Sequence, residues 1–67
     1  MDDKEKEYLE AKISRRLSCI KTQVDYQLKR YNQYKTFIPS QFTESMNYIK
    51  EYMNDIKIAS DKISKDY

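Results

Sequence analysis

The side chains with the most scope for chemistry lie along one face of a predicted helix between residues 8 and 33. They follow one another at steps of four, three, four, seven, four and three residues, which keeps them on one side of an α-helix. Cations that alternate with tyrosines can bind phosphate groups and stack on unpaired bases, or they can anchor a protein interface. We call this set the basic stripe: Tyr8, Lys12, Arg15, Cys19, Tyr26, Arg30 and Gln33.

The distribution of charge narrows the partners that this stripe would suit. Residues 11–38 carry seven bases and one acid, residues 1–10 carry five acids and two bases, and the whole chain has a net charge of +2. So modest a charge favours a protein partner, because nucleic-acid-binding domains usually have a more basic surface. Two alternatives stay open. One, the most usual for a mixed polar face on a helix, is that the stripe is only solvated, and the other is RNA or DNA bound through Lys12, Arg15, Arg16 and Arg30.

Cys19 is the only cysteine of the chain, which also has no histidine. The cations Lys12, Arg15 and Arg16 nearby would favour the thiolate, which is the form of cysteine that reacts with oxidants. A small residue at a helix surface or dimer contact is the simpler explanation of Cys19. Because a single cysteine cannot close an internal disulfide, the sequence favours a reducing compartment.

The residue inventory argues against catalysis and cofactor binding. Without histidine the chain lacks the most common general base, and without glycine it lacks a glycine-rich phosphate-binding loop. The sequence contains neither a nucleophile motif nor a cluster of metal ligands. We therefore expect a non-enzymatic protein with no catalytic residue, metal, cofactor or small-molecule substrate.

Two helices are expected to position these residues. The absence of glycine, and with it of Asn-Gly and Asp-Gly turns, favours an all-α protein. The first helix is expected over about residues 3–36, beginning near Asp2 or Asp3, whose carboxylates suit the positive end of the helix dipole. Pro39 is the only residue in the chain that strongly interrupts a helix, and it separates this helix from a second one over about residues 40–65.

The start of the second helix has two interpretations. Pro39 can be its first residue, which places Phe37 and Phe42 at the spacing of a hydrophobic staple, a contact between side chains that flank a helix start. Alternatively, Ser40 is the N-cap. The sequence does not distinguish between them.

Each predicted helix carries a stripe of apolar residues at alternating steps of three and four. An antiparallel hairpin folded at residues 37–40 pairs positions whose numbers add to about 77, and in this register the stripes meet layer by layer, with Leu17 opposite Ser60 as the thinnest layer. The sequence therefore predicts a two-helix antiparallel hairpin with both stripes buried between the helices. The stripes are Leu9, Ile13, Leu17, Ile20, Val24, Leu28 and Tyr31, and Phe42, Met46, Ile49, Met53, Ile56, Ser60 and Ile63.

A single hairpin of 67 residues is short of core, which predicts self-association. So small a chain is usually marginal without disulfides, a metal or a partner chain. The second helix also carries Tyr48, Tyr52 and Ala59 beside its stripe, and these residues are the expected dimer interface. We expect a homodimer that forms a four-helix bundle, although the same tyrosines would also suit a different protein.

These expectations define one domain, residues 1–67, and a function. The N-terminus is too charged for a signal peptide, and no apolar run reaches the roughly 20 residues that span a bilayer, so a cytoplasmic protein without membrane contact is expected. The bias toward Lys, Ile and Tyr points to an AT-rich genome, such as that of a low-GC bacterium or of one of its phages or plasmids. These features together predict a function.

The sequence predicts a small interaction protein that dimerises and binds a partner protein as a regulator or inhibitor. The alternatives are a nucleic-acid-binding regulatory dimer and a structural assembly component.

Overall fold

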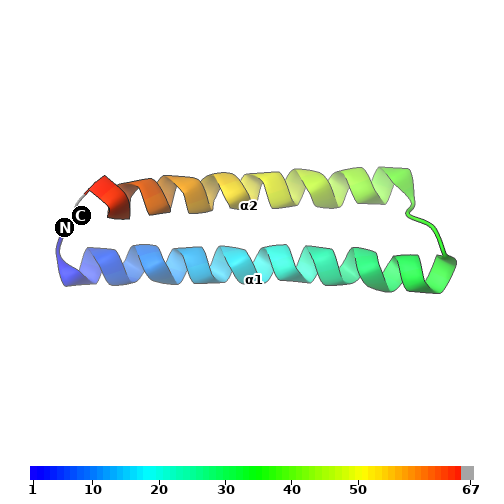
Figure 1. Cartoon of the computed structure of the whole chain (residues 1–67), viewed down its shortest axis with the longest axis horizontal. Helices are drawn as coiled ribbons and strands as arrows, with labels where there is room; N and C mark the ends of the chain where they lie inside the picture. The colour runs from blue at the N-terminus through cyan, green and yellow to red at the C-terminus, as the bar shows by residue number, and fades with distance from the viewer. Residues whose placement is uncertain (66–67) are drawn as a thin grey trace.

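The chain forms an antiparallel hairpin of two long helices. In the computed structural model, which describes residues 1–65, α1 (Asp3–Tyr34) and α2 (Pro39–Lys65) lie side by side along a molecule 48 Å long (Figure 1). Within the described residues the secondary structure is entirely helical, which confirms the predicted all-α hairpin. We call the end with the turn the loop end, and the end where α1 begins and α2 finishes the open end.

The start of α1 is fixed by its first acidic residues, as predicted. Asp2 is the N-cap, and its carboxylate accepts a hydrogen bond of 2.7 Å from the backbone N–H of Glu5. Asp3 and Glu5 add negative charge to the first turn, where the N–H groups without helical partners make the helix end positive. The acidic N-terminus is therefore accounted for by helix capping.

The turn at residues 35–38 lies slightly earlier than the sequence analysis placed it. Lys35 adopts the left-handed conformation, with φ of 59°, and its backbone N–H donates to the carbonyl of Tyr31 at 2.7 Å. This backbone reversal ends α1 at Tyr34 rather than near Thr36. A glycine is the usual residue at such a position, and this chain has none.

The start of α2 follows the first of the two predicted interpretations. Pro39 is the first residue of the helix, so Ser40 is not its N-cap. The rings of Phe37 and Phe42 lie 5.1 Å apart, and the backbone N–H of Phe42 donates to the carbonyl of Ile38 at 2.9 Å. The staple of Phe37 on Phe42 therefore fixes the direction in which the chain enters α2.

Replacing Lys35 by glycine is expected to stabilise the hairpin. A non-glycine residue in the left-handed region is strained by about 1 kcal/mol, and the Lys35→Gly variant relieves that strain. Thermal unfolding followed by circular dichroism should show a higher midpoint at equal protein concentration. The matched control, Lys29→Gly, removes the same charge inside α1 and is expected to lower the midpoint. A Lys35→Gly midpoint at or below that of the unmodified chain would contradict the assigned turn.

The line of contact between the helices differs from the predicted one. Cross-helix hydrogen bonds join Gln27 to Ser45 and Arg16 to Asp55, four polar residues that the predicted apolar layers did not include. The described residues that are buried are Leu9, Ala59, Gln27 and Ser45, two apolar and two polar. The helices are therefore rotated toward polar contacts, and the predicted pairs Ile13 with Ile63 and Leu17 with Ser60 line hollows beside the contact instead of forming its core.

Most of the predicted apolar stripes lie at the edge of this contact or outside it. The isoleucines at 13, 20, 49, 56 and 63 are half-buried at the contact. Leu17 is 54% exposed and Met53 is 58% exposed, although both were expected in the core. The same correction applies to the exposed side chains of Val24, Leu28, Tyr31 and Met46.

Candidate functional site

A polar network occupies the loop half of the contact between α1 and α2. The amide nitrogen of Gln27 donates to the hydroxyl of Ser45 at 2.7 Å, and that hydroxyl donates to the amide oxygen of Gln23 at 2.9 Å. The same nitrogen of Gln27 lies 3.3 Å from the backbone oxygen of Gln41. Because these bonds satisfy buried polar groups in a directional way, the network fixes the register and rotation of the two helices.

Arg16 is held within the hairpin. Its Nε lies 2.9 Å from Oδ2 of Asp55, and its guanidinium lies 5.7 Å from the centre of the Tyr52 ring. Both charged side chains keep about a third of their surface exposed, so the pair contributes under about 1 kcal/mol. The pair engages the Nε–H of Arg16 within the hairpin, so this arginine is less free to turn toward a partner than the sequence predicts.

Arg30 forms a cluster with two tyrosines of α1. Its guanidinium lies 5.5 Å from the ring of Tyr26 and 5.2 Å from the ring of Tyr34, and its Nη1 donates to the Tyr26 hydroxyl at 3.3 Å. Cation–π contacts of this kind order long side chains. An ordered arginine between tyrosines is typical of the residues that carry binding energy in protein interfaces.

A groove with polar walls runs beside this cluster and brings residues of both helices together. Tyr26 lines it from α1, and Tyr48, which is exposed, lines it from α2. The volume of the groove is about 380 Å³. We call this side of the hairpin the polar face. Its groove is lined by Thr22, Gln23, Tyr26, Gln41, Glu44, Ser45 and Tyr48.

The remaining predicted site residues fall into different environments. Tyr8 and Arg15 are exposed and their side chains are accessible to a partner, whereas Lys12 and Cys19 are half-buried. Ala59 is 2% exposed and packs inside the hairpin, so its assignment to an outward dimer interface is wrong.

Tyr48 and Tyr52, the other residues assigned to a dimer interface, stack on each other with ring centres 6.4 Å apart. Tyr48 lines the polar groove, and Tyr52 lies half-buried beneath the Arg16 guanidinium. Both tyrosines therefore lie on the polar side of the helix contact. Neither contributes to the side on which apolar residues gather.

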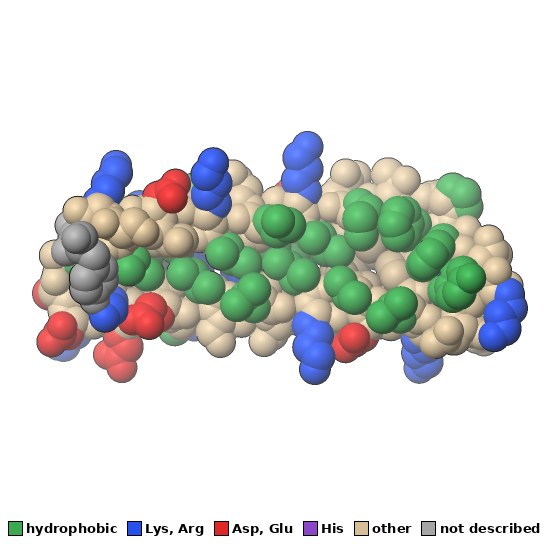
Figure 2. Space-filling view, in the orientation of Figure 1, with side chains coloured by type: hydrophobic (Ala, Val, Ile, Leu, Met, Phe, Trp, Pro, Cys, Tyr) green, Lys and Arg blue, Asp and Glu red, His purple; other side chains and the backbone are tan. Residues whose placement is uncertain are grey.

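An apolar surface covers the other side of the helix contact. Figure 2 shows a band of hydrophobic side chains that runs over both helices, with lysines and acids along its edges. We call this surface the apolar face. It consists of exposed Leu17, Val24, Leu28, Tyr31, Phe37, Met46 and Met53 together with half-buried Ile20, Phe42, Ile49 and Ile56.

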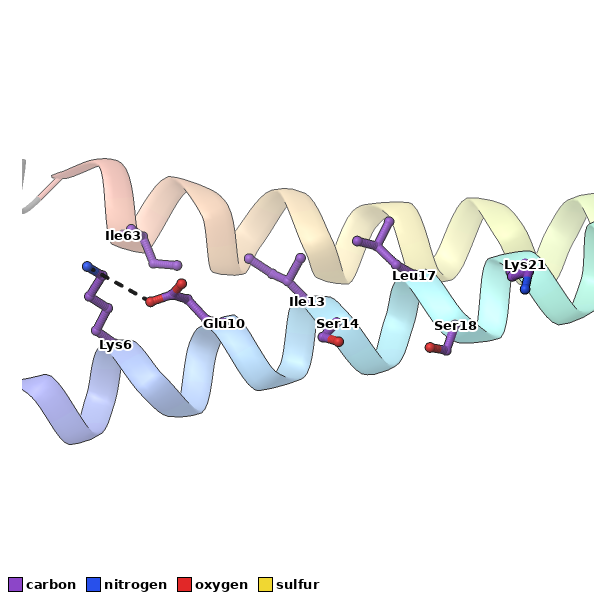
Figure 3. Close-up of a pocket in the computed structure, with 8 residues that line it drawn as sticks. All are labelled: Lys6, Glu10, Ile13, Ser14, Leu17, Ser18, Lys21 and Ile63. Carbon is purple, nitrogen blue, oxygen red and sulfur yellow. Dashed lines mark ion pairs between the residues drawn. The ribbon is translucent and has the colours of Figure 1, made fainter.

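Two hollows indent the apolar face toward the open end. The larger has a volume of about 550 Å³, and Figure 3 shows Ile13 and Leu17 of α1 and Ile63 of α2 at its wall. The second, of about 450 Å³, lies between Leu17 and Met53 and includes Ser60. Both hollows are lined mainly by carbon, so they suit an apolar occupant.

The sequence analysis missed this face because it placed the same residues inside the hairpin. Gln27 lies at the same helical angle as Leu9, so a glutamine inside the predicted apolar sector was the signal that polar residues share the contact.

These observations define a class: a helical hairpin with a polar contact between its helices, one apolar face and one polar face. Across residues 1–65, neither helix has a segment long and apolar enough to cross a membrane. No group of three or more His, Cys, Asp or Glu side chains that could hold a metal ion occurs in the same described part.

Comparison with known proteins does not extend this class to a family. No protein-family model matches the chain, and neither the curated proteins nor the solved structures contain a significant match.

Proposed function

We propose that this chain is a small, non-enzymatic helical interaction protein that dimerises through its apolar face and binds a partner protein through its polar face. In this proposal the dimer is the folded, working unit, a four-helix bundle. We assign no catalytic group to the chain. It would therefore regulate or inhibit its partner by covering part of the partner's surface.

The observation that carries the proposal is the amount of surface that the hairpin leaves exposed. The chain exposes 5407 Å², whereas a compact monomer of its mass, 8.2 kDa, would expose about 4,500 Å². The excess of about 900 Å² is close to the about 800 Å² that each partner contributes to a standard protein interface. Because seven of the exposed hydrophobic residues lie together on the apolar face, a partner chain would cover them in a single contact.

The contacts of the polar face favour a protein over a nucleic acid as the ligand. Two of the four cations considered for phosphate binding, Arg16 and Arg30, are engaged within the hairpin by Asp55 and by tyrosine rings. Glu44 also lines the groove, and its carboxylate would repel a phosphate backbone. Exposed Tyr26 and Tyr48 beside an ordered Arg30 instead resemble the anchors of a protein interface.

Site-specific cross-linking in the source organism tests the partner directly. A photoreactive amino acid at position 15, on the basic stripe, is expected to capture one predominant protein, whereas the same amino acid at position 54 of α2 is not. The double variant Tyr26→Ala/Arg30→Ala should reduce capture from position 15 at least about tenfold, because it removes two anchors. Equal capture from positions 15 and 54 would contradict a partner site on the polar face.

Titration with RNA and DNA at about 50 and 200 mM salt separates the two ligand classes. We expect no tight binding that weakens steeply with salt. Such binding, if it is lost in Lys12→Ala/Arg15→Ala/Arg30→Ala without loss of helicity, would replace the protein-partner proposal by the nucleic-acid alternative. Growth of the protein into assemblies larger than a dimer would instead indicate a structural component.

A further inference from the structure

The apolar face differs between its two halves. Its loop half carries large side chains, and two of its ring pairs are in contact: Tyr31 with Phe37 at 4.8 Å and Phe37 with Phe42 at 5.1 Å. Leu28 and Met46 continue this bulky surface on α1 and α2, and both are exposed. The loop half therefore projects from the hairpin.

The open half of the same face contains the two hollows, whose lining includes three serines among apolar residues and the charged side chains of Lys6, Glu10 and Lys21. Ser14 and Ser18 lie on the α1 side of the larger hollow, as Figure 3 shows, and Ser60 lines the smaller one. Together the hollows extend from the level of Lys6 to that of Lys21, which is about half of α1. The open half therefore offers space where the loop half offers bulk.

We propose that the apolar face is covered by a second copy of this chain in antiparallel orientation, so that the loop half of each hairpin packs on the hollow half of the other. This inference rests on the dimer of the proposed function and specifies its geometry. A two-fold axis near the middle of the hairpin makes both contacts equivalent, as a closed dimer requires. Leu17 and Met53 lie near the middle of α1 and α2 and line the same hollow, so both are close to that axis.

The alternative parallel dimer is poorly matched in shape. It would place the bulky loop halves against each other and leave the two hollow halves facing across a gap. Voids of this size are destabilising because their walls lose packing contacts. The antiparallel arrangement instead fills about 550 Å³ and 450 Å³ of hollow with the partner's side chains.

The charges at the two ends favour the same orientation. Residues 26–43, which form the loop end, carry three bases and no acid. At the open end, residues 1–10 carry five acids and two bases, and residues 57–65 carry three bases and one acid. A parallel dimer brings the two positive loop ends together, whereas an antiparallel dimer places each beside an open end of slightly negative net charge.

Distances between spin labels test the orientation. In a Cys19→Ser background, one label is attached at Ser40→Cys in the loop end or at Ser64→Cys in the open end, both exposed positions. Each singly labelled dimer is expected to show a label separation of about 40 Å, because the labels lie at opposite ends of helices of this length. A mixture of the two labelled chains is expected to add a separation below about 25 Å, from mixed dimers with both labels at one end.

The possible outcomes separate the orientation from the dimer itself. A short distance between two Ser40→Cys labels overturns the antiparallel packing and leaves the dimer intact. The absence of dipolar coupling in protein that circular dichroism shows to be helical overturns both the packing and the dimer. Long distances in both single-label samples, with a short one in the mixture, support the proposal.

Discussion

Leu17→Glu is expected to weaken self-association at least about 100-fold, equivalent to about 2.7 kcal/mol. In an isolated hairpin the Leu17 side chain is 54% exposed, so a carboxylate there costs little. In the proposed dimer the side chain lies near the two-fold axis, where two new carboxylates would be desolvated in an apolar contact close to each other. The substitution therefore affects the dimer far more than the single chain.

Sedimentation over a concentration series measures this effect, and Ile58→Glu is its matched control. Ile58 is also an exposed hydrophobic residue on a helix, at 48%, but it lies outside the set that forms the apolar face. The control introduces the same charge and is expected to leave the dimer unchanged. If both variants associate as the unmodified chain does, the apolar face is not a contact between copies.

The second large effect is expected from Gln27→Ala, which should lower the free energy of unfolding by about 2 kcal/mol. The substitution removes the amide that donates to Ser45 and leaves a buried hydroxyl without one of its partners. Such a loss is a large fraction of the roughly 3–5 kcal/mol that a core of this size supplies. The reduced stability would be measured by urea unfolding at fixed protein concentration.

Two further variants test whether hydrogen bonding accounts for the loss. Gln33→Ala removes an exposed glutamine of the same helix and should change stability by less than about 0.5 kcal/mol. Gln27→Leu/Ser45→Ala removes both fully buried polar side chains and should recover most of the loss, because the acceptors that lose a donor, on Gln23 and Gln41, are only half-buried. A double variant as unstable as Gln27→Ala would show that the network does not act through these bonds.

The polar network also explains why the apolar stripes are not buried against each other. Rotating both helices so that Leu17, Val24 and Met53 faced inward would carry Gln27 and Ser45 out of their paired positions. An apolar contact is tolerant of small rotations, whereas hydrogen bonds at 2.7 and 2.9 Å are not. The network thus fixes the rotation of the two helices and keeps the apolar face exposed for the proposed dimer.

The fold was predictable from the sequence because its signals are local. Asp2 caps α1 through its own carboxylate, and Pro39 can occupy only the first turn of α2. The absence of glycine excluded most hairpin turns between strands. Each of these effects acts within a few residues of the chain and needs no knowledge of packing.

The faces through which the two helices contact each other were not predictable in the same way. They depend on Lys35 adopting a left-handed conformation that its residue type disfavours, and on buried glutamine side chains, a residue type that is mostly exposed in proteins. Periodicity shows that Leu17 and Met53 share an apolar face with their neighbours, but it does not show which helix covers that face. The same limit applies to Arg16, whose ion pair with Asp55 joins positions 39 residues apart.

Sedimentation equilibrium of the unmodified chain, from about 1 to 500 µM, tests the dimer most directly. Circular dichroism of the same samples establishes that the protein is helical. The proposal predicts that the helical protein has twice the mass of the 8.2 kDa chain, with dissociation accompanied by loss of helix at the lowest concentrations. A stable, fully helical species of 8.2 kDa across the whole range would contradict it.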